Sequence, residues 1–280
     1  MKHQFGGFWT RVKLERLSSY LPCFTREMGR DYCTIYVDPF AGTGTINYYK
    51  PSKTGLKGFF PDPPPIDGSA KRALKVDPLF DRYIFVDRDH DHCQELRRMR
   101  DRFPHLKDRV RVRKGDANER IVRLCEATDW SSSRAFFFLD PYGMQVNWKT
   151  IEAIAKTKAA DVWYLFPISA TLRLLQRRNK PPRSQRLKLD RFFGERSWAR
   201  EFYHTLGYNG LISGPIRVTS RHAHERQVVR YFVRRLRSAF EWVSKTPLRL
   251  VNKRGSLMFH LYFASSIPGN RGRTKLQWTF

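Results

Sequence analysis

Four short strand-like segments of this chain each lead into an aspartate, and this pattern constrains the fold more than any other feature. The aspartates are Asp38, Asp87, Asp116 and Asp140, and a fifth apolar segment follows at 162–166. Apolar residues at helical spacing lie between these segments, as in βαβ units. The alternation predicts an α/β fold with a mostly parallel, doubly wound sheet. Because parallel strands end at one edge of an open sheet, the four aspartates should share that edge.

The remaining segments suggest three parts. Residues 1–167 are predicted as an N-terminal helix over Phe8–Met28, which could instead end near Pro22, followed by a Rossmann-like core. Residues 168–245 interrupt the alternation and are predicted as a basic, mostly helical insertion that binds substrate. Residues 246–280 contain two apolar runs around a turn, so we expect a β-hairpin that completes the core sheet. Within the first part, residues 50–68 are rich in proline and glycine and are expected to form a long functional or mobile loop.

A glycine loop follows the first predicted strand and reads Asp-Pro-Phe-Ala-Gly-Thr-Gly-Thr over 38–45. Glycines at 42 and 44 allow backbone angles and close approaches that a Cβ would forbid. A dinucleotide fingerprint needs a third glycine at position 47, which is Asn, and a phosphate-binding Walker loop needs a lysine where Thr45 stands. What remains is the acid-x-apolar-x-Gly-x-Gly pattern of class I methyltransferases that use S-adenosyl-L-methionine (SAM). The loop therefore predicts SAM as the cofactor.

The chemistry of SAM suggests a role for each part of this edge. Asp38 and the amides of residues 42–45 would hold the methionine part, Asp87 the ribose hydroxyls, and Asp116 the adenine amine, with Ala117 against the ring. An acidic edge suits a cationic sulfonium and would repel a pyrophosphate. Alternatively, an aspartate after a strand simply caps the next helix. The predicted cofactor-binding residues are Asp38, Phe40, Ala41, Gly42, Thr43, Gly44, Asp87, Asp116 and Ala117.

The segment Asp140-Pro141-Tyr142 is the predicted catalytic element. The Asp140 carboxylate and the Pro141 carbonyl could accept the hydrogens of an exocyclic base amine, and Tyr142 could stack on the base. A target in a duplex would have to be flipped out. The alternative is a type I turn with proline at its second position. The motif lacks one proline of the Asp-Pro-Pro-Tyr motif of amino methyltransferases, and Gly143 follows it.

The charge of the chain points to a polyanionic partner. The net charge is +27; residues 1–150 hold 27 Lys and Arg against 19 Asp and Glu, whereas residues 151–280 hold 26 against 7. This asymmetry favours nucleic acid, RNA or DNA, bound mainly by the C-terminal half. We expect no membrane association, because no apolar run approaches the roughly 18 residues of a span and no signal peptide is seen.

Scattered cysteines indicate a reducing, cytoplasmic setting rather than a disulfide framework or a zinc site. The histidine groups at 90–93 and 222–225 offer no complete ligand set, so no metal is predicted.

Several motifs together resemble the bacterial three-Cys-motif partner proteins. They are Phe5-Gly6-Gly7 with Trp9-Thr10 and Lys13-Leu14, the glycine loop, Gly68-Ser69, the Gly115–Asn118 segment, the block from Phe138 to Pro167, Phe193-Gly194 with Trp198, and Leu261–Ser265. The resemblance covers nearly the whole chain. It implies a class I SAM-dependent methyltransferase-like protein whose partner is a separate, radical-SAM-like protein carrying three cysteines.

The leading hypothesis is thus a SAM-dependent methyltransferase acting on nucleic acid at an exocyclic base amine. The alternative is a catalytically inactive nucleic-acid-binding subunit of the three-cysteine partner, in a phage or defence context. A third reading, a nuclease-like activity, would need a carboxylate and lysine motif that the sequence does not show.

Overall fold

The computed structural model describes residues 8–46, 65–177, 179–210 and 214–269. Residues 5–7 of the family resemblance, and most of the predicted loop at 50–68, lie outside these ranges. The described end of that segment forms a small antiparallel pair, β2 (Thr45–Ile46) with β3 (Ile66–Asp67).

The centre of the molecule is an eight-stranded sheet. Its parallel strands, in spatial order, are β5 (Val110–Lys114), β4 (Arg82–Asp87), β1 (Cys33–Asp38), β6 (Ser133–Leu139) and β7 (Ala160–Phe166). The long strand β12 (Leu257–Ser265) runs antiparallel to β7, and β11 (Leu248–Val251) and β10 (Trp242–Val243) pair antiparallel with β12. The predicted α/β class, mostly parallel sheet and antiparallel C-terminal strand pair are confirmed.

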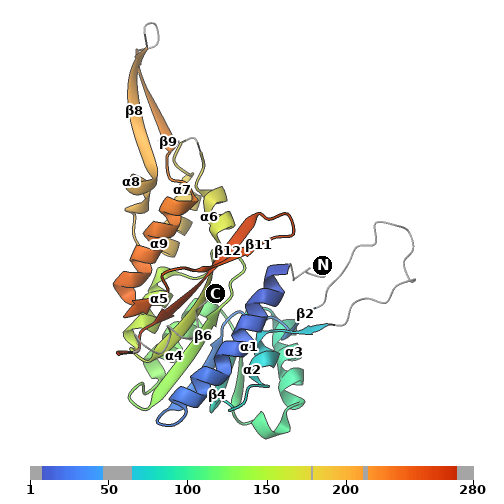
Figure 1. Cartoon of the computed structure of the whole chain (residues 1–280). Coiled ribbons are helices and arrows are strands. Elements are labelled where there is room, and N and C mark those ends of the chain that lie inside the picture. Colours follow the sequence, from blue (N-terminus) through green and yellow to red (C-terminus); the bar gives the residue numbers. More distant parts are fainter. Residues whose placement is uncertain (1–7, 47–64, 178, 211–213, 270–280) are drawn as a thin grey trace, which may run out of the picture.

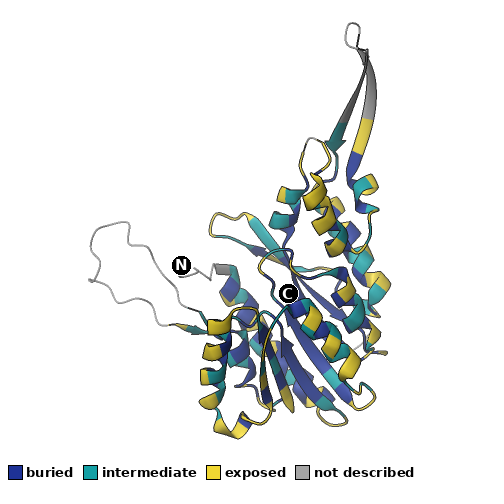
Figure 2. Cartoon of the chain, turned by 180° about the vertical axis from the view of Figure 1, so that it is seen from behind, coloured by how far each residue is buried: buried dark blue, intermediate teal, exposed yellow. Residues whose placement is uncertain are grey.

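Helices cover both faces of this sheet (Figure 1). On one face lie α1 (Phe8–Met28), α2 (Ser69–Ala73) and α3 (His90–Asp101), followed by the short 3₁₀ helix η1 (Pro104–Leu106); on the other lie α4 (Ala117–Ala127) and α5 (Trp148–Lys156). The alternation along the strands explains both layers: Tyr36 and Phe136 pack toward α1, whereas Val37 and Phe137 pack toward α5. Figure 2 shows the buried strands enclosed by helices whose outer sides are exposed.

Helix α1 spans Phe8–Met28, as the sequence predicts, and it continues through Pro22, near which the alternative placed its end. An internal proline costs a helix about 3 kcal/mol. Beyond the proline, however, Phe24 and Met28 are almost completely buried. Burying one such side chain contributes about 1.5–3 kcal/mol. Tertiary packing therefore outweighs the local cost.

The segment between β7 and β10 holds α6 (Ile168–Leu174), α7 (Arg183–Phe193), α8 (Trp198–Phe202), β8 (Tyr203–Gly210), β9 (Gly214–Arg221) and α9 (Glu225–Ala239). The antiparallel hairpin β8–β9 extends away from the sheet (Figure 1) and was not expected in a mostly helical insertion. Residues with high strand propensity, such as Thr205 and Thr219, favour it, and their hydroxyls lie 3.0 Å apart across the pair. The division at 167 and 245 stays a prediction.

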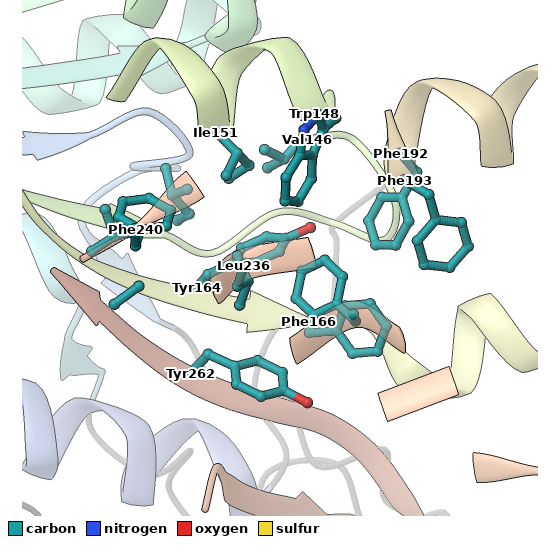
Figure 3. Packing of buried hydrophobic residues seen from close by; sticks show 14 of the residues in the cluster. Val146, Trp148, Ile151, Tyr164, Phe166, Phe192, Phe193, Leu236, Phe240 and Tyr262 are labelled. Carbon is teal, nitrogen blue, oxygen red and sulfur yellow. The ribbon is translucent and has the colours of Figure 1, made fainter. Parts of the chain in front are cut away.

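Aromatic side chains join this segment to the sheet (Figure 3). The Phe166 ring of β7 stacks on Phe232 of α9 with centroids 4.1 Å apart, and Phe192 of α7 stacks on Phe166 at 5.6 Å. Gly194 ends α7 with φ of +77°, and a Cβ there would lie 2.1 Å from the Trp148 ring. Only glycine meets both requirements.

Candidate functional site

The four predicted aspartates lie at neighbouring positions along one edge of the sheet. Because β5, β4, β1 and β6 are adjacent, the residues at or just after their carboxyl ends follow in the order Asp116, Asp87, Asp38 and Asp140. The edge therefore concentrates carboxylates as the sequence pattern predicts.

Asp38 is the most buried of these acids, with no exposed surface. Its Oδ2 accepts a hydrogen bond from the Ser69 hydroxyl at 2.6 Å, and its Oδ1 accepts one from the Phe40 amide at 3.3 Å. Burial raises the pKa of Asp38 from 3.8 to about 7; the Ser69 hydroxyl opposes this rise, and the Asp140 carboxylate adds to it. The carboxyl is thus poised to ionise when a cationic group binds beside it.

Hydrogen bonds hold the glycine loop in place, and the loop borders open space at Gly42. The Ala41 amide donates to the Val86 carbonyl at 3.1 Å, and the Gly44 amide donates to the Ala41 carbonyl at 3.2 Å. The Thr43 hydroxyl donates to the Thr45 carbonyl at 2.8 Å. Gly42 has φ of +57°, and a Cβ there would meet nothing within 4 Å. The space beside Gly42 is open, so a ligand could approach the backbone there.

Asp87 and Asp116 both bind protein donors. The Asp87 carboxylate accepts from the Gly42 amide at 3.0 Å and from the Asp89 amide at 2.8 Å, so it also braces the glycine loop. Asp116 is the N-cap of α4, as the alternative reading expects, and it pairs with Arg88. The hydrogen bonds to its carboxylate and Arg88 lower the pKa of Asp116 against the opposing effect of burial.

Ala117, the first residue of α4, is buried. The ribose and adenine roles of Asp87, Asp116 and Ala117 stay predictions.

Asp140 forms an ion pair with Lys13 of α1, a contact the sequence reasoning missed. The Lys13 side chain is 7% exposed and that of Asp140 is 25% exposed. Lys13 contacts Oδ2, and within the described ranges no hydrogen bond reaches Oδ1. Pro141 is buried, whereas Tyr142 is 80% exposed, and its amide donates to the Gln145 side chain at 2.9 Å. The predicted catalytic segment thus presents a fixed carboxylate beside an exposed aromatic ring.

Two functional candidates, Lys13 and Ser69, therefore come from the structure. Lys13 precedes the buried Leu14 and lies one turn before Leu17, so a lysine at the border of an apolar helix stripe was the available signal. Ser69 was quoted only as part of a motif. Both side chains reach the acidic edge from the α1 and α2 side of the sheet.

Searches of the described ranges find no group of three or more His, Cys, Asp and Glu that could hold a metal ion. Nor does any helix within them have the length and apolarity needed to cross a membrane.

Comparisons with known proteins place the fold. No protein-family model matches the chain, and no curated protein matches it in sequence. Among solved structures, a Legionella pneumophila protein of the family DUF519 matches with a TM-score of 0.54 at 12% identity, covering 97% of this chain and 90% of that one. An O-methyltransferase from Bacillus cereus in complex with SAH matches with a TM-score of 0.41 at 13% identity, covering 89% and 80%.

The chain has a Rossmann-like α/β fold. This conclusion rests on its own strand order and on the DUF519 structure, since the lower score of the O-methyltransferase carries no argument. At these identities the comparisons show the fold alone. The resemblance to three-Cys-motif partner proteins stays a prediction from the sequence motifs.

Proposed function

We propose that this protein is a SAM-dependent methyltransferase that acts on nucleic acid at an exocyclic base amine. The observation that carries the proposal is the edge of the sheet, where an open glycine loop and a buried carboxyl adjoin the fixed carboxylate of Asp140.

The residues at the edge fit the cofactor. The open space beside Gly42 would admit SAM, and Asp38, once ionised, would attract the positively charged methionine part of SAM. The amides of Gly42 and Gly44 already donate to protein acceptors, and the Thr45 amide donates to the Thr43 hydroxyl at 3.5 Å. Of the predicted loop amides, that of Thr43 is therefore the favoured donor to the cofactor. When bound, SAM supplies a methyl group attached to a cationic sulfur.

Asp140 and Pro141 would prepare the acceptor. A base amine is a poor nucleophile because its lone pair is delocalised into the ring. Hydrogen bonds from the amine to Asp140 Oδ1 and to the Pro141 carbonyl would localise that lone pair. The amine nitrogen would then bond to the methyl carbon that SAM supplies as the carbon–sulfur bond breaks, and the amine would lose one proton to solvent. Lys13 would hold the carboxylate in place, and Tyr142 would stack on the base.

The charge distribution supports a nucleic-acid substrate. Residues 168–245 hold 18 Lys and Arg against 5 Asp and Glu. On α9, Arg226, Arg230 and Arg234 follow one another at intervals of one helical turn, and all three are exposed. Such a row would contact phosphates and set the register of a strand without reading its sequence.

The family resemblance adds a proposed partner and setting. A three-cysteine, radical-SAM-like protein would be the partner. The four cysteines of this chain are free thiols, which suits a reducing cytoplasm. If SAM does not bind at millimolar concentration in calorimetry, the remaining proposal is an inactive nucleic-acid-binding subunit of that partner.

The deciding experiment incubates the protein with methyl-labelled SAM and separate RNA, DNA and protein pools. Label in RNA or DNA is expected, whereas label in protein alone would refute the nucleic-acid proposal. Asp140→Ala should abolish the transfer while nucleic-acid affinity stays nearly unchanged, because phosphate contacts dominate that affinity. Retention of transfer by Asp140→Ala would show that the catalytic assignment is wrong.

A further inference from the structure

A cavity of about 480 Å³ lies beyond the acidic edge, where α6 leaves β7. Its walls come from α6, from the end of β9, from the start of α9 and from the start of β12, elements that meet at the base of the hairpin (Figure 1). Since β7 is the sheet neighbour of β6, this pocket lies one strand along from Asp140, at the same edge.

The pocket wall is built by specific contacts. Arg221, at the end of β9, donates to the carbonyl of Leu172 in the last turn of α6 at 3.1 Å and to that of Leu175, just after α6, at 2.9 Å. The Arg221 amide donates to the Arg177 carbonyl at 3.0 Å. These bonds tie the hairpin to α6, so the cavity is formed before any ligand arrives.

The lining combines three kinds of surface. Arg173 and Arg177 are exposed cations on one side. Leu172 and Leu257 provide apolar surface. Glu225, the first residue of α9, provides a carboxylate. Arginines suit a phosphate, and the apolar surface suits the face of a base. A carboxylate would accept hydrogen bonds from base donors but would repel a bare anion.

Behind Glu225 lie two buried polar side chains, His260 and Tyr262. His260 is 4% exposed, its Nε2 is 3.5 Å from Glu225 Oε1, and neither ring nitrogen makes a hydrogen bond within the described ranges. The neighbouring Tyr262 hydroxyl is also buried, and no hydrogen bond reaches it from the described part of the chain. Burial lowers the pKa of His260, so its ring is neutral and can donate or accept. These two side chains lie behind the lining residue Glu225 and do not themselves line the pocket.

We propose that this pocket holds a second nucleotide of the substrate strand, adjacent in the strand to the nucleotide that carries the acceptor amine. Arg173 and Arg177 bind its phosphate, Leu172 and Leu257 pack on its base, and Glu225 accepts from a base amino group. The proposal rests on the proposed function for the position of the target, but the binding itself needs neither SAM nor methyl transfer.

The test measures binding of a fluorescent single-stranded RNA octamer and of cytidine monophosphate, without SAM. Leu257→Trp fills the pocket without changing the charge and should weaken both ligands about tenfold, the value of one stacked base. Arg173→Ala alters an exposed residue and should weaken both ligands more than its matched control, Arg237→Ala, which removes the same charge from the far end of α9.

Several results would overturn the inference. The inference fails if Arg173→Ala and Arg237→Ala bind the octamer equally well, or if Leu257→Trp leaves octamer binding unchanged. It also fails if inorganic phosphate binds as tightly as cytidine monophosphate, or if neither nucleotide ligand binds. If Leu257→Trp weakens only the monophosphate, the pocket takes a free nucleotide instead. The two proposals fail separately: pocket-dependent RNA binding without methyl transfer would refute only the proposed function, and methyl transfer with normal binding by the pocket variants would refute only this inference.

Discussion

Replacing Asp38 by asparagine should stabilise the protein at alkaline pH while destroying the proposed cofactor site. The carboxyl is fully buried, and its pKa rises from 3.8 to about 7, with burial as the main cause. One pKa unit corresponds to about 1.4 kcal/mol. Ionising Asp38 in the folded protein therefore costs about 4 kcal/mol more than ionising it in the unfolded chain.

The pH dependence follows from the direction of that pKa change. Between pH 3.8 and about 7 the folded protein keeps a proton on Asp38 that the unfolded chain has lost. Raising the pH through this range therefore favours the unfolded chain by about 1.4 kcal/mol per pH unit. Relative to Asp38→Asn, which does not titrate, the wild type should lose about 3 kcal/mol of stability between pH 5 and pH 7.

Urea denaturation of both proteins at pH 5, 6, 7 and 8 would measure this difference, and calorimetry would measure SAM binding in parallel. We expect the stability gap to widen up to pH 7 and then level off, and the asparagine variant to bind SAM poorly because it offers no negative charge. A gap that does not change with pH would refute the reasoning about burial. Normal SAM binding by the variant would refute the role of the charge.

Four further variants test other parts of the edge. Gly42→Ala should lower the free energy of unfolding by about 1 kcal/mol because of its left-handed backbone, and it should block SAM binding. Gly44→Ala should lower the free energy of unfolding more, because its Cβ would lie 2.6 Å from a methionine sulfur. Urea denaturation and calorimetry compare the pair, and a Gly44→Ala variant as stable as Gly42→Ala would contradict the packing argument. Lys13→Met should slow methyl transfer with little change in SAM affinity and destabilise by about 1–3 kcal/mol, since it leaves Asp140 without its partner; unchanged kcat would exclude the positioning role. Tyr142→Ala should change the free energy of unfolding by no more than about 0.5 kcal/mol, because the side chain is 80% exposed. If Tyr142 stacks on a base, the variant should weaken the binding of single-stranded RNA by about 1–3 kcal/mol in anisotropy titrations. Equal affinity would show that it does not stack.

The sequence predicted the sheet well because its strands are buried on both faces. A run such as Phe136–Leu139 between turn residues leaves few alternatives to an inner parallel strand, and the aspartate after it locates the carboxyl edge. The glycine loop was also predictable from the sequence, because the positive φ of Gly42 and Gly44 is a local requirement for glycine.

Long-range contacts account for what the sequence could not show. The partner of Asp140 lies 127 residues earlier, on a helix whose rotation about its axis depends on packing. The hairpin β8–β9 was missed because its strands, of eight residues each, mix polar residues with glycines and carry little periodic signal. Asp116 shows the remaining ambiguity: one carboxylate caps a helix and pairs with Arg88, and the same residue type would serve a ligand.

The joining of α9 to the sheet has a consequence for how this protein can change in evolution. Its inner side, with Phe232 stacked on Phe166, is part of the main hydrophobic core, while its outer side carries the exposed arginines. Mutations on the outer side could change the affinity for the proposed nucleic-acid partner at almost no cost in stability. Mutations on the inner side would lower the stability of the whole fold. Divergence among descendants of this chain should therefore be rapid on one side of a single helix and slow on the other.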